Sequence, residues 1–145
     1  MKYFDLHCDT IGECSNNNFS LKENNLHIDL QRAKEIEEYT QVFAIWIPDE
    51  LRGEDAVKYF DKTADYFYNE IARNKDLISL YKENKETPVK AILSVEGGSA
   101  CGGTLEGLYH LYERGVRLIT LTWNAVNEIG SGAFSEGGLT PFGKE

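Results

Sequence analysis

A histidine and an aspartate stand two residues apart near the start of the chain. His7 and Asp9 follow a short apolar run, Tyr3 to Leu6. If this run is a β-strand, its side chains alternate between two faces, and His7 and Asp9 point the same way. Imidazole nitrogen and carboxylate oxygen are ordinary zinc ligands, and catalytic zinc sites keep one position open for water. The pair alone is compatible with a divalent metal site or with a polar strand end that binds no metal.

Three more side chains that could take part in chemistry come directly after apolar runs. They are Glu96, Trp123 and Asn124. In parallel α/β folds the catalytic residues gather at the carboxyl ends of strands. Glu96 would then lie level with His7 and Asp9, which favours a third metal ligand over a turn carboxylate that precedes two glycines. Trp123 and Asn124 would lie at the same edge of the sheet.

Other chemically capable residues give weaker signals. Cys8 has the opposite parity to its two neighbours, so we expect it to face away from the site. His27 stands alone before a helix, and His110 lies in the middle of one between tyrosines, so both are interpreted as structural. The sequence contains no G-x-S-x-G, Walker A or G-x-G-x-x-G motif.

The elements that must position these residues follow from hydrophobic patterning and from capping residues. We predict strands near 3–6, 42–47, 89–95 and 116–122, and helices near 29–38, 54–85, 105–114 and from Thr140 onward, with Asp29, Thr104 and Thr140 as N-caps. Asn74 is a candidate break in the long helix. Strands that alternate with helices predict an α/β fold with a parallel sheet.

The polar stretch Gly12 to Asn25 contains five asparagines and predicts a loop. It is long for a connection within a compact domain, which favours a flap over the site, with a plain solvated connection as the alternative.

Composition excludes several functional classes. The chain has 145 residues, a net charge of -9 and a pI of about 4.8. This acidic balance argues against nucleic-acid binding, which needs clusters of Lys and Arg. No apolar run is long enough to span a bilayer, so we expect no membrane contact. The three cysteines form no C-x-x-C pair and are interpreted as free thiols, and the absence of a signal-peptide pattern favours the cytoplasm.

Five motifs in order along the chain resemble those of the renal (membrane) dipeptidase family, which are zinc metallopeptidases of the amidohydrolase type. The motifs are Asp5-Leu6-His7-Cys8-Asp9-Thr10, Phe43-Ala44-Ile45-Trp46, Ser94-Val95-Glu96-Gly97-Gly98, Leu121-Thr122-Trp123-Asn124 and Gly138-Leu139-Thr140-Pro141-Phe142-Gly143. They extend from one end of the chain to the other and are specific in combination.

The resemblance implies a (β/α)8 barrel that holds two zinc ions. His7 and Asp9 would bind the first ion, and Glu96 would bridge both. Paired zinc would lower the pKa of a water molecule and polarise the scissile carbonyl of a dipeptide. The two further metal-binding histidines of the family come after the last motif, so this chain ends before them. Some members carry a substrate-contacting histidine where this chain has Trp123, so the resemblance implies that Trp123 and Asn124 contact the substrate.

The sequence therefore predicts the N-terminal half of a metallo-dipeptidase barrel over residues 1–145, with no internal domain boundary and about four parallel strands. We expect at most one zinc ion in this chain, little or no activity of the chain alone, and association as a homo-oligomer or with a C-terminal half. Two alternatives stay open. One is another amidohydrolase-type metal hydrolase, and the other is a non-catalytic half barrel that associates with another chain.

Overall fold

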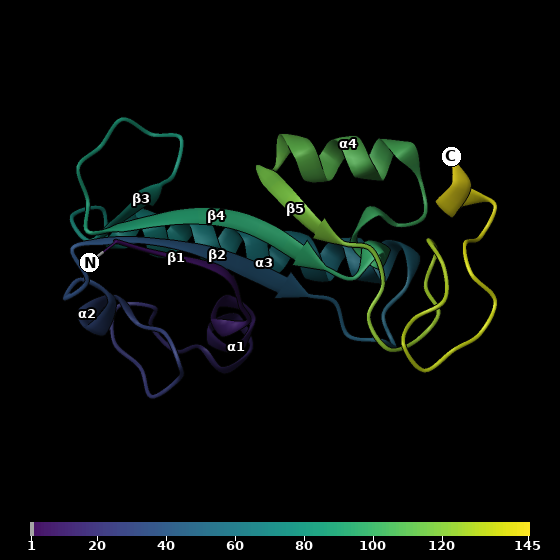
Figure 1. The fold of residues 1–145 in the computed structure, drawn as a ribbon, viewed down its shortest axis with the longest axis horizontal. Helices are drawn as coiled ribbons and strands as arrows, with labels where there is room; N and C mark the ends of the chain where they lie inside the picture. The colour runs from purple at the N-terminus through teal and green to yellow at the C-terminus, as the bar shows by residue number, and fades with distance from the viewer. Residues whose placement is uncertain (1) are drawn as a thin grey trace. The chain divides into compact units, whose positions relative to one another are not determined.

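The computed structural model describes residues 2–145, in which strands and helices alternate along the chain (Figure 1). The elements are β1 (Lys2–Cys8), α1 (Thr10–Asn17), α2 (Leu30–Ala33), β2 (Glu38–Trp46), α3 (Gly53–Arg73), β3 (Ile78–Leu80), β4 (Val89–Glu96), the 3-10 helix η1 (Gly98–Cys101), α4 (Leu105–Glu113), β5 (Val116–Thr120) and the 3-10 helix η2 (Phe142–Lys144). No helix among the described residues is both long enough and apolar enough to cross a bilayer.

The strands form one five-stranded sheet in the hydrogen-bonded order β1-β2-β4-β3, and β5 also pairs with β4. The strands β1 and β2 are parallel, and so are β3 and β4. The strand β3 pairs with Val89–Ala91, so it lies beside the first three residues of β4. The parallel α/β sheet expected from the alternation of strands and helices is confirmed.

The chain divides into two compact units. One comprises the chain up to Ala44 together with Thr63–Leu93, and the other comprises Ile45–Lys62 and Ser94–Glu145. The elements β2, α3 and β4 contribute residues to both units.

The core of the first unit forms where β2 meets α3. Val42, Phe43 and Ala44 are all buried, so successive residues are covered on both faces of the strand, as in parallel sheets. The ring of Phe43 packs against Phe67 of α3 with centroids 5.7 Å apart. Phe67 is fully buried and belongs to this core.

The polar stretch after Asp9 begins with a helix and not with the predicted loop. In α1 the side chains of Ile11 and Cys14, three residues apart, are fully buried. The helix ends where Asn18 adopts a left-handed conformation with φ of 55°, and the amide of Phe19 donates to the carbonyl of Cys14. The run of asparagines obscures this pair of buried residues in the sequence.

The long helix ends just before Asn74, the candidate break, and does not resume toward Lys85 as predicted. After Arg73, Asn74 closes α3 by donating its side-chain amide to the carbonyl of Glu70 at 2.9 Å. The following apolar residues form β3, where Ile78 and Ser79 are buried beside β4, and do not continue the helix. Three residues are too few for periodicity to distinguish a strand from a helix.

The short helix α2 is also shorter than predicted. The Asp29 cap is confirmed, since its side chain accepts a hydrogen bond from the amide of Arg32 at 2.9 Å. The helix nevertheless ends at Ala33, and β2 begins at Glu38, four residues before the predicted start of the strand.

In the second unit α4 is delimited as the sequence predicts. The Thr104 hydroxyl accepts a hydrogen bond from the amide of Gly107 at 2.9 Å. At the other end Gly115 has φ of 92°, which favours glycine, and donates its amide to the carbonyl of Tyr112.

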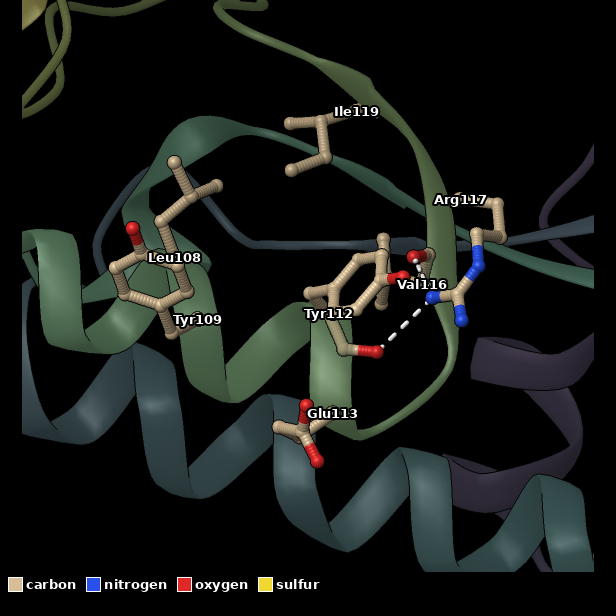
Figure 2. A pocket seen from close by; sticks show the side chains of 7 residues that line it. All are labelled: Leu108, Tyr109, Tyr112, Glu113, Val116, Arg117 and Ile119. Atoms are coloured by element: carbon tan, nitrogen blue, oxygen red, sulfur yellow. Dashed lines mark hydrogen bonds between the residues drawn. The ribbon is translucent and has the colours of Figure 1, made fainter.

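An apolar groove of about 640 Å³ lies between α4 and β5 (Figure 2). Leu108, Tyr109 and Tyr112 of α4 line it and remain 43%, 71% and 57% exposed. From β5, Arg117 places its guanidinium 4.1 Å from the centre of the Tyr112 ring and donates to the Tyr112 carbonyl. This groove forms an exposed apolar surface of the second unit.

Candidate metal centre

The side chains of His7 and Asp9 meet at the end of β1. The Nε2 atom of His7 lies 3.3 Å from Oδ1 of Asp9, and both side chains are accessible to solvent. An imidazole nitrogen and a carboxylate oxygen at this separation can bind a common divalent ion.

The backbone around His7 departs from the regular strand. The parallel register between β1 and β2 shifts between Asp5 and Cys8. Within this irregular stretch the amide of His7 donates to Oδ1 of Asp5 at 3.0 Å. The Asp5 carboxylate therefore holds the segment that carries the imidazole.

Asp9 sits at the N-cap position of α1, yet its carboxylate makes no capping hydrogen bond. Its backbone carbonyl accepts the amides of Gly12 and Glu13. The backbone of Asp9 thus begins the helix while its side chain points toward His7. A carboxylate that does not cap its own helix is available as a metal ligand.

Glu96 is the last residue of β4, and hydrogen bonds to two neighbouring segments hold its backbone in place. The Glu96 carbonyl accepts the amide of Ile47 at 2.8 Å, and the next amide, that of Gly97, donates to Thr120 at 2.9 Å. Gly97 has φ of 107°, and a Cβ added at Gly98 would come within 2.4 Å of an Ile129 side-chain carbon. Two glycines are therefore needed for the turn that follows Glu96.

The three predicted metal ligands form one group. His7, Asp9 and Glu96 each offer one ligand atom, and these atoms all lie within 4.8 Å of one another. Among residues 2–145 this is the one group of three or more His, Cys, Asp or Glu side chains close enough to hold an ion.

Trp123 follows β5 and packs against Trp46, the last residue of β2. Their ring centroids are 5.2 Å apart in an edge-to-face arrangement, and Trp123 is 40% exposed. The carbonyls of Trp123 and Asn124 accept the amides of Ala133 and Phe134, which fold the Gly-rich segment back onto this turn. The aromatic pair presents an apolar surface beside polar backbone.

The remaining candidate residues do not join the group. Burial raises the pKa of the Cys8 thiol to about 12, although a hydrogen bond with Thr10 opposes the shift, so the thiol stays protonated. His110 is a packing residue, since Nε2 lies 2.8 Å from Oδ1 of Asp61 and its ring meets Phe60 edge to face. His27 is exposed.

A further carboxylate, which was not among the predicted site residues, contacts the turn that follows Glu96. Glu128 accepts hydrogen bonds from the Ser99 hydroxyl at 2.6 Å and from the amide of Gly53 at 2.8 Å. Partial burial raises its pKa, but the two hydrogen bonds and nearby Arg52 outweigh this effect, and the pKa lies below that of an ordinary glutamate. No sequence pattern marks this residue, because its partners are distant in the chain.

A family model and two solved structures resemble this chain. The family model described as membrane dipeptidase, peptidase family M19, matches residues 1–145. Comparison with the curated proteins gave no match.

Two solved structures share the fold. One is a metallo-peptidase from Rhodobacter sphaeroides liganded with a phosphinate mimic of the dipeptide L-Ala-D-Ala, with a TM-score of 0.85 and 21% identity; the match covers 99% of this chain and 54% of that one. The other is dipeptidase AC, a metallo-peptidase of family M19, with a TM-score of 0.82, 24% identity, and coverage of 99% and 52%. The present chain spans about half the length of these two chains.

The family model extends over the full sequence, and the matched folds follow the chain over nearly all of its residues. The family resemblance drawn from the five sequence motifs is confirmed. The chain belongs to the membrane dipeptidase family, peptidase family M19.

Proposed function

We propose that this chain is the N-terminal half of a metallo-dipeptidase and that His7, Asp9 and Glu96 hold a divalent metal ion, with zinc as the expected metal. The observation that carries the proposal is the convergence of one nitrogen and two carboxylate donors within 4.8 Å. Membership of a metallo-dipeptidase family supports the same assignment.

The donor set fits a catalytic type of zinc site. Three protein ligands leave a fourth position open for water or substrate, and histidine together with carboxylates is a usual combination. When bound, such an ion polarises a peptide carbonyl and lowers the pKa of water. His7 must present an unprotonated nitrogen, Asp9 supplies one carboxylate oxygen, and Glu96 has two oxygens with which it could contact two ions.

The substrate that we propose is a dipeptide whose second residue is either L or D. One matched structure, the Rhodobacter sphaeroides metallo-peptidase, is liganded with a phosphinate mimic of L-Ala-D-Ala. In the present chain the Trp46–Trp123 pair offers an apolar contact surface for a small side chain. Trp123 and Asn124 are the residues that we expect to touch the substrate.

We further propose that the 145-residue chain alone hydrolyses dipeptides at a negligible rate. One group of side chains that could hold a metal ion lies among residues 2–145. If His7 and Asp9 bind the first ion, Glu96 is the member of this group that could also contact a second ion. A single carboxylate is too little to hold a second metal tightly.

A dipeptide phosphinate tests the site without requiring turnover. Calorimetry of the zinc-loaded chain with a phosphinate mimic of L-Ala-D-Ala should show binding that is lost without zinc and lost in His7→Ala. The matched control, His110→Ala, should bind as the wild type does, because His110 pairs with Asp61. Equal binding by His7→Ala would contradict the proposal, and so would hydrolysis of a cyclic amide or an ester in preference to every dipeptide tested.

A further inference from the structure

The Glu128 carboxylate joins three segments of the second unit. Its Oε2 accepts the Ser99 hydroxyl at 2.6 Å, and its Oε1 accepts the amide of Gly53 at 2.8 Å. The neighbouring carbonyl of Val126 accepts a side-chain hydrogen bond from Arg52 at 2.7 Å. One side chain therefore connects η1, the start of α3 and the segment that follows β5.

The hydroxyl held by Glu128 belongs to the turn directly after Glu96. Ser99 is the third residue beyond Glu96 and is 2% exposed. Between them Gly97 and Gly98 donate their amides to Thr120 and Leu121. The backbone of Glu96 is thus attached to neighbouring strands, and the first buried side chain beyond it is attached to Glu128.

The Glu128 side chain also packs closely against Gly103, near the end of this turn. A Cβ added at Gly103 would lie 3.0 Å from the Cγ atom of Glu128, so the aliphatic part of the glutamate side chain leaves no room for a larger residue there. A hydrogen bond to an ionised carboxylate is shorter and stronger than one between neutral groups. Glu128 is therefore suited to fixing the turn from outside the ligand set.

We propose that Glu128 is a positioning residue for the metal centre: through Ser99 it holds the turn that orients the Glu96 carboxylate. The inference rests on the proposed function, because it assumes that Glu96 is a metal ligand. Groups that orient metal ligands from outside the ligand set typically change metal affinity about 10- to 100-fold when mutated.

The test is a double-mutant cycle on metal affinity. Co²⁺ dissociation constants and visible absorption spectra are measured for the wild type, Glu128→Gln, Ser99→Ala and the double variant, with Glu136→Gln as the exposed control. Glutamine keeps the size of the side chain and removes one acceptor oxygen and the charge. Thermal melts of the metal-free proteins report any general loss of stability.

We expect each single variant to bind Co²⁺ about tenfold or more weakly, with an altered absorption spectrum, and the double variant to bind no more weakly than the poorer single. If Glu128 only stabilised the fold, Glu128→Gln would lower the melting temperature and leave the absorption spectrum of bound Co²⁺ unchanged. That result would overturn the inference. So would a dissociation constant for Glu128→Gln equal to that of Glu136→Gln. A wild type that binds no Co²⁺ or Zn²⁺ would overturn the metal centre itself.

Discussion

At the scale of single residues, Trp123 is the side chain whose role is most directly measurable. Its ring packs edge to face against the ring of Trp46, and the residue as a whole is 40% exposed. Trp123→Ala should weaken binding of the dipeptide phosphinate by about 0.5–1.5 kcal/mol, the range for aromatic contacts, and leave the zinc affinity unchanged. Calorimetry with each ligand in turn separates the two effects.

The matched control for this substitution is Tyr109→Ala, which removes an exposed aromatic ring from α4. It should change neither affinity. Loss of zinc binding in Trp123→Ala would show that the residue acts on the metal centre and would contradict a contact made only with substrate.

The proximity of His7 and Asp9 could be predicted from the sequence because the two residues are close neighbours in the chain. Strand alternation predicts one face for His7 and Asp9. The structure brings Nε2 and Oδ1 to 3.3 Å, although β1 ends at Cys8 and Asp9 is the N-cap of α1. Glu128 could not be predicted, since its contacts with Ser99 and Gly53 span 29 and 75 positions of the chain. Patterns of neighbouring residues carry no information about such contacts.

At the scale of elements, the Asp29 cap gives α2 a pH-dependent stability. Burial raises the pKa of Asp29, but hydrogen bonds from the backbone and side chain of Arg32 outweigh it, and the pKa is lowered overall. A carboxyl whose pKa is lower in the folded state stabilises the fold above its unfolded pKa, about 4, and loses this effect as the pH falls through its folded pKa.

Asp29→Ala should therefore lower the free energy of unfolding by about 0.5–2 kcal/mol at neutral pH. Urea titrations from pH 7 down to pH 3 should show the difference between variant and wild type shrinking toward the acid end. Asp29→Asn keeps an acceptor for the amide of Arg32 and should lose less. A difference that grows with acidity would contradict the assigned sign.

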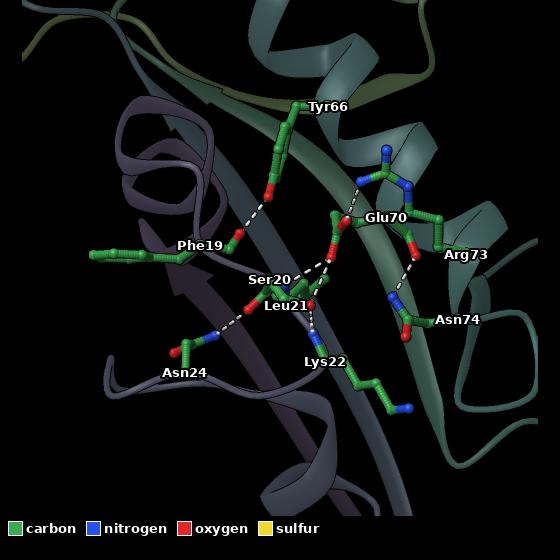
Figure 3. A network of polar contacts seen from close by, with 9 residues as sticks. All are labelled: Phe19, Ser20, Leu21, Lys22, Asn24, Tyr66, Glu70, Arg73 and Asn74. Atoms are coloured by element: carbon green, nitrogen blue, oxygen red, sulfur yellow. Dashed lines mark hydrogen bonds and ion pairs between the residues drawn. The ribbon is translucent and has the colours of Figure 1, made fainter.

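The buried Glu70 of α3 anchors the segment that follows α1 (Figure 3). Its Oε2 accepts the amide of Leu21 at 2.7 Å, and its Oε1 pairs with Arg73 at 3.1 Å. Glu70 is 2% exposed and Leu21 is fully buried, so loss of the acceptor leaves a buried amide unpaired. Tyr66 of the same helix donates to the carbonyl of Phe19.

Glu70→Ala should destabilise the chain by about 1–3 kcal/mol, the cost of an unsatisfied buried donor. Glu70→Gln keeps an acceptor and should cost less, and the exposed control Glu86→Ala should stay within about 0.5 kcal/mol of the wild type. Urea denaturation measures all three, and hydrogen exchange at the Leu21 amide should accelerate only in the Glu70 variants. Unchanged exchange in Glu70→Ala would contradict the anchor.

Elements with a cap or a long period could be predicted, and short ones could not. Thr104 and Asp29 cap helices as predicted, because a side-chain acceptor acts within three residues. The strand β3 has only three residues and is set by its pairing with β4. The loop expected over Gly12 to Asn25 begins inside α1, because Ile11 and Cys14 are buried on one side of that helix.

At the scale of the whole molecule, the fold is that of an incomplete (β/α)8 barrel, and the chain spans about half the length of its solved relatives. Within the described residues, β1 and β5 each pair with one strand. Open sheet edges and exposed apolar surface recruit partners.

The parallel fold class could be predicted from the alternation of strands and helices, whereas the position of β3 beside β4 depends on contacts that this pattern does not encode.

We expect the purified chain to associate as a dimer or a larger assembly. The apolar groove between α4 and β5 contributes to this surface, and Tyr109 is its most exposed aromatic residue among those that line it. Tyr109→Lys should shift sedimentation toward the monomer, whereas a substitution at exposed Glu136 should not. A wild-type monomer with a cooperative melt above about 60 °C, the upper end for mesophile domains, would contradict the expectation.

The central claim is that His7, Asp9 and Glu96 together hold one divalent ion, and metal content measures it most directly. Elemental analysis of the 145-residue chain after dialysis against zinc should give one ion and no second ion per chain in the wild type and in His110→Ala, and none in His7→Ala or Asp9→Ala. The bound zinc should be lost as the pH falls, because His7 coordinates only when its nitrogen is unprotonated. Two tightly held ions per chain, or zinc retained without His7, would contradict the account.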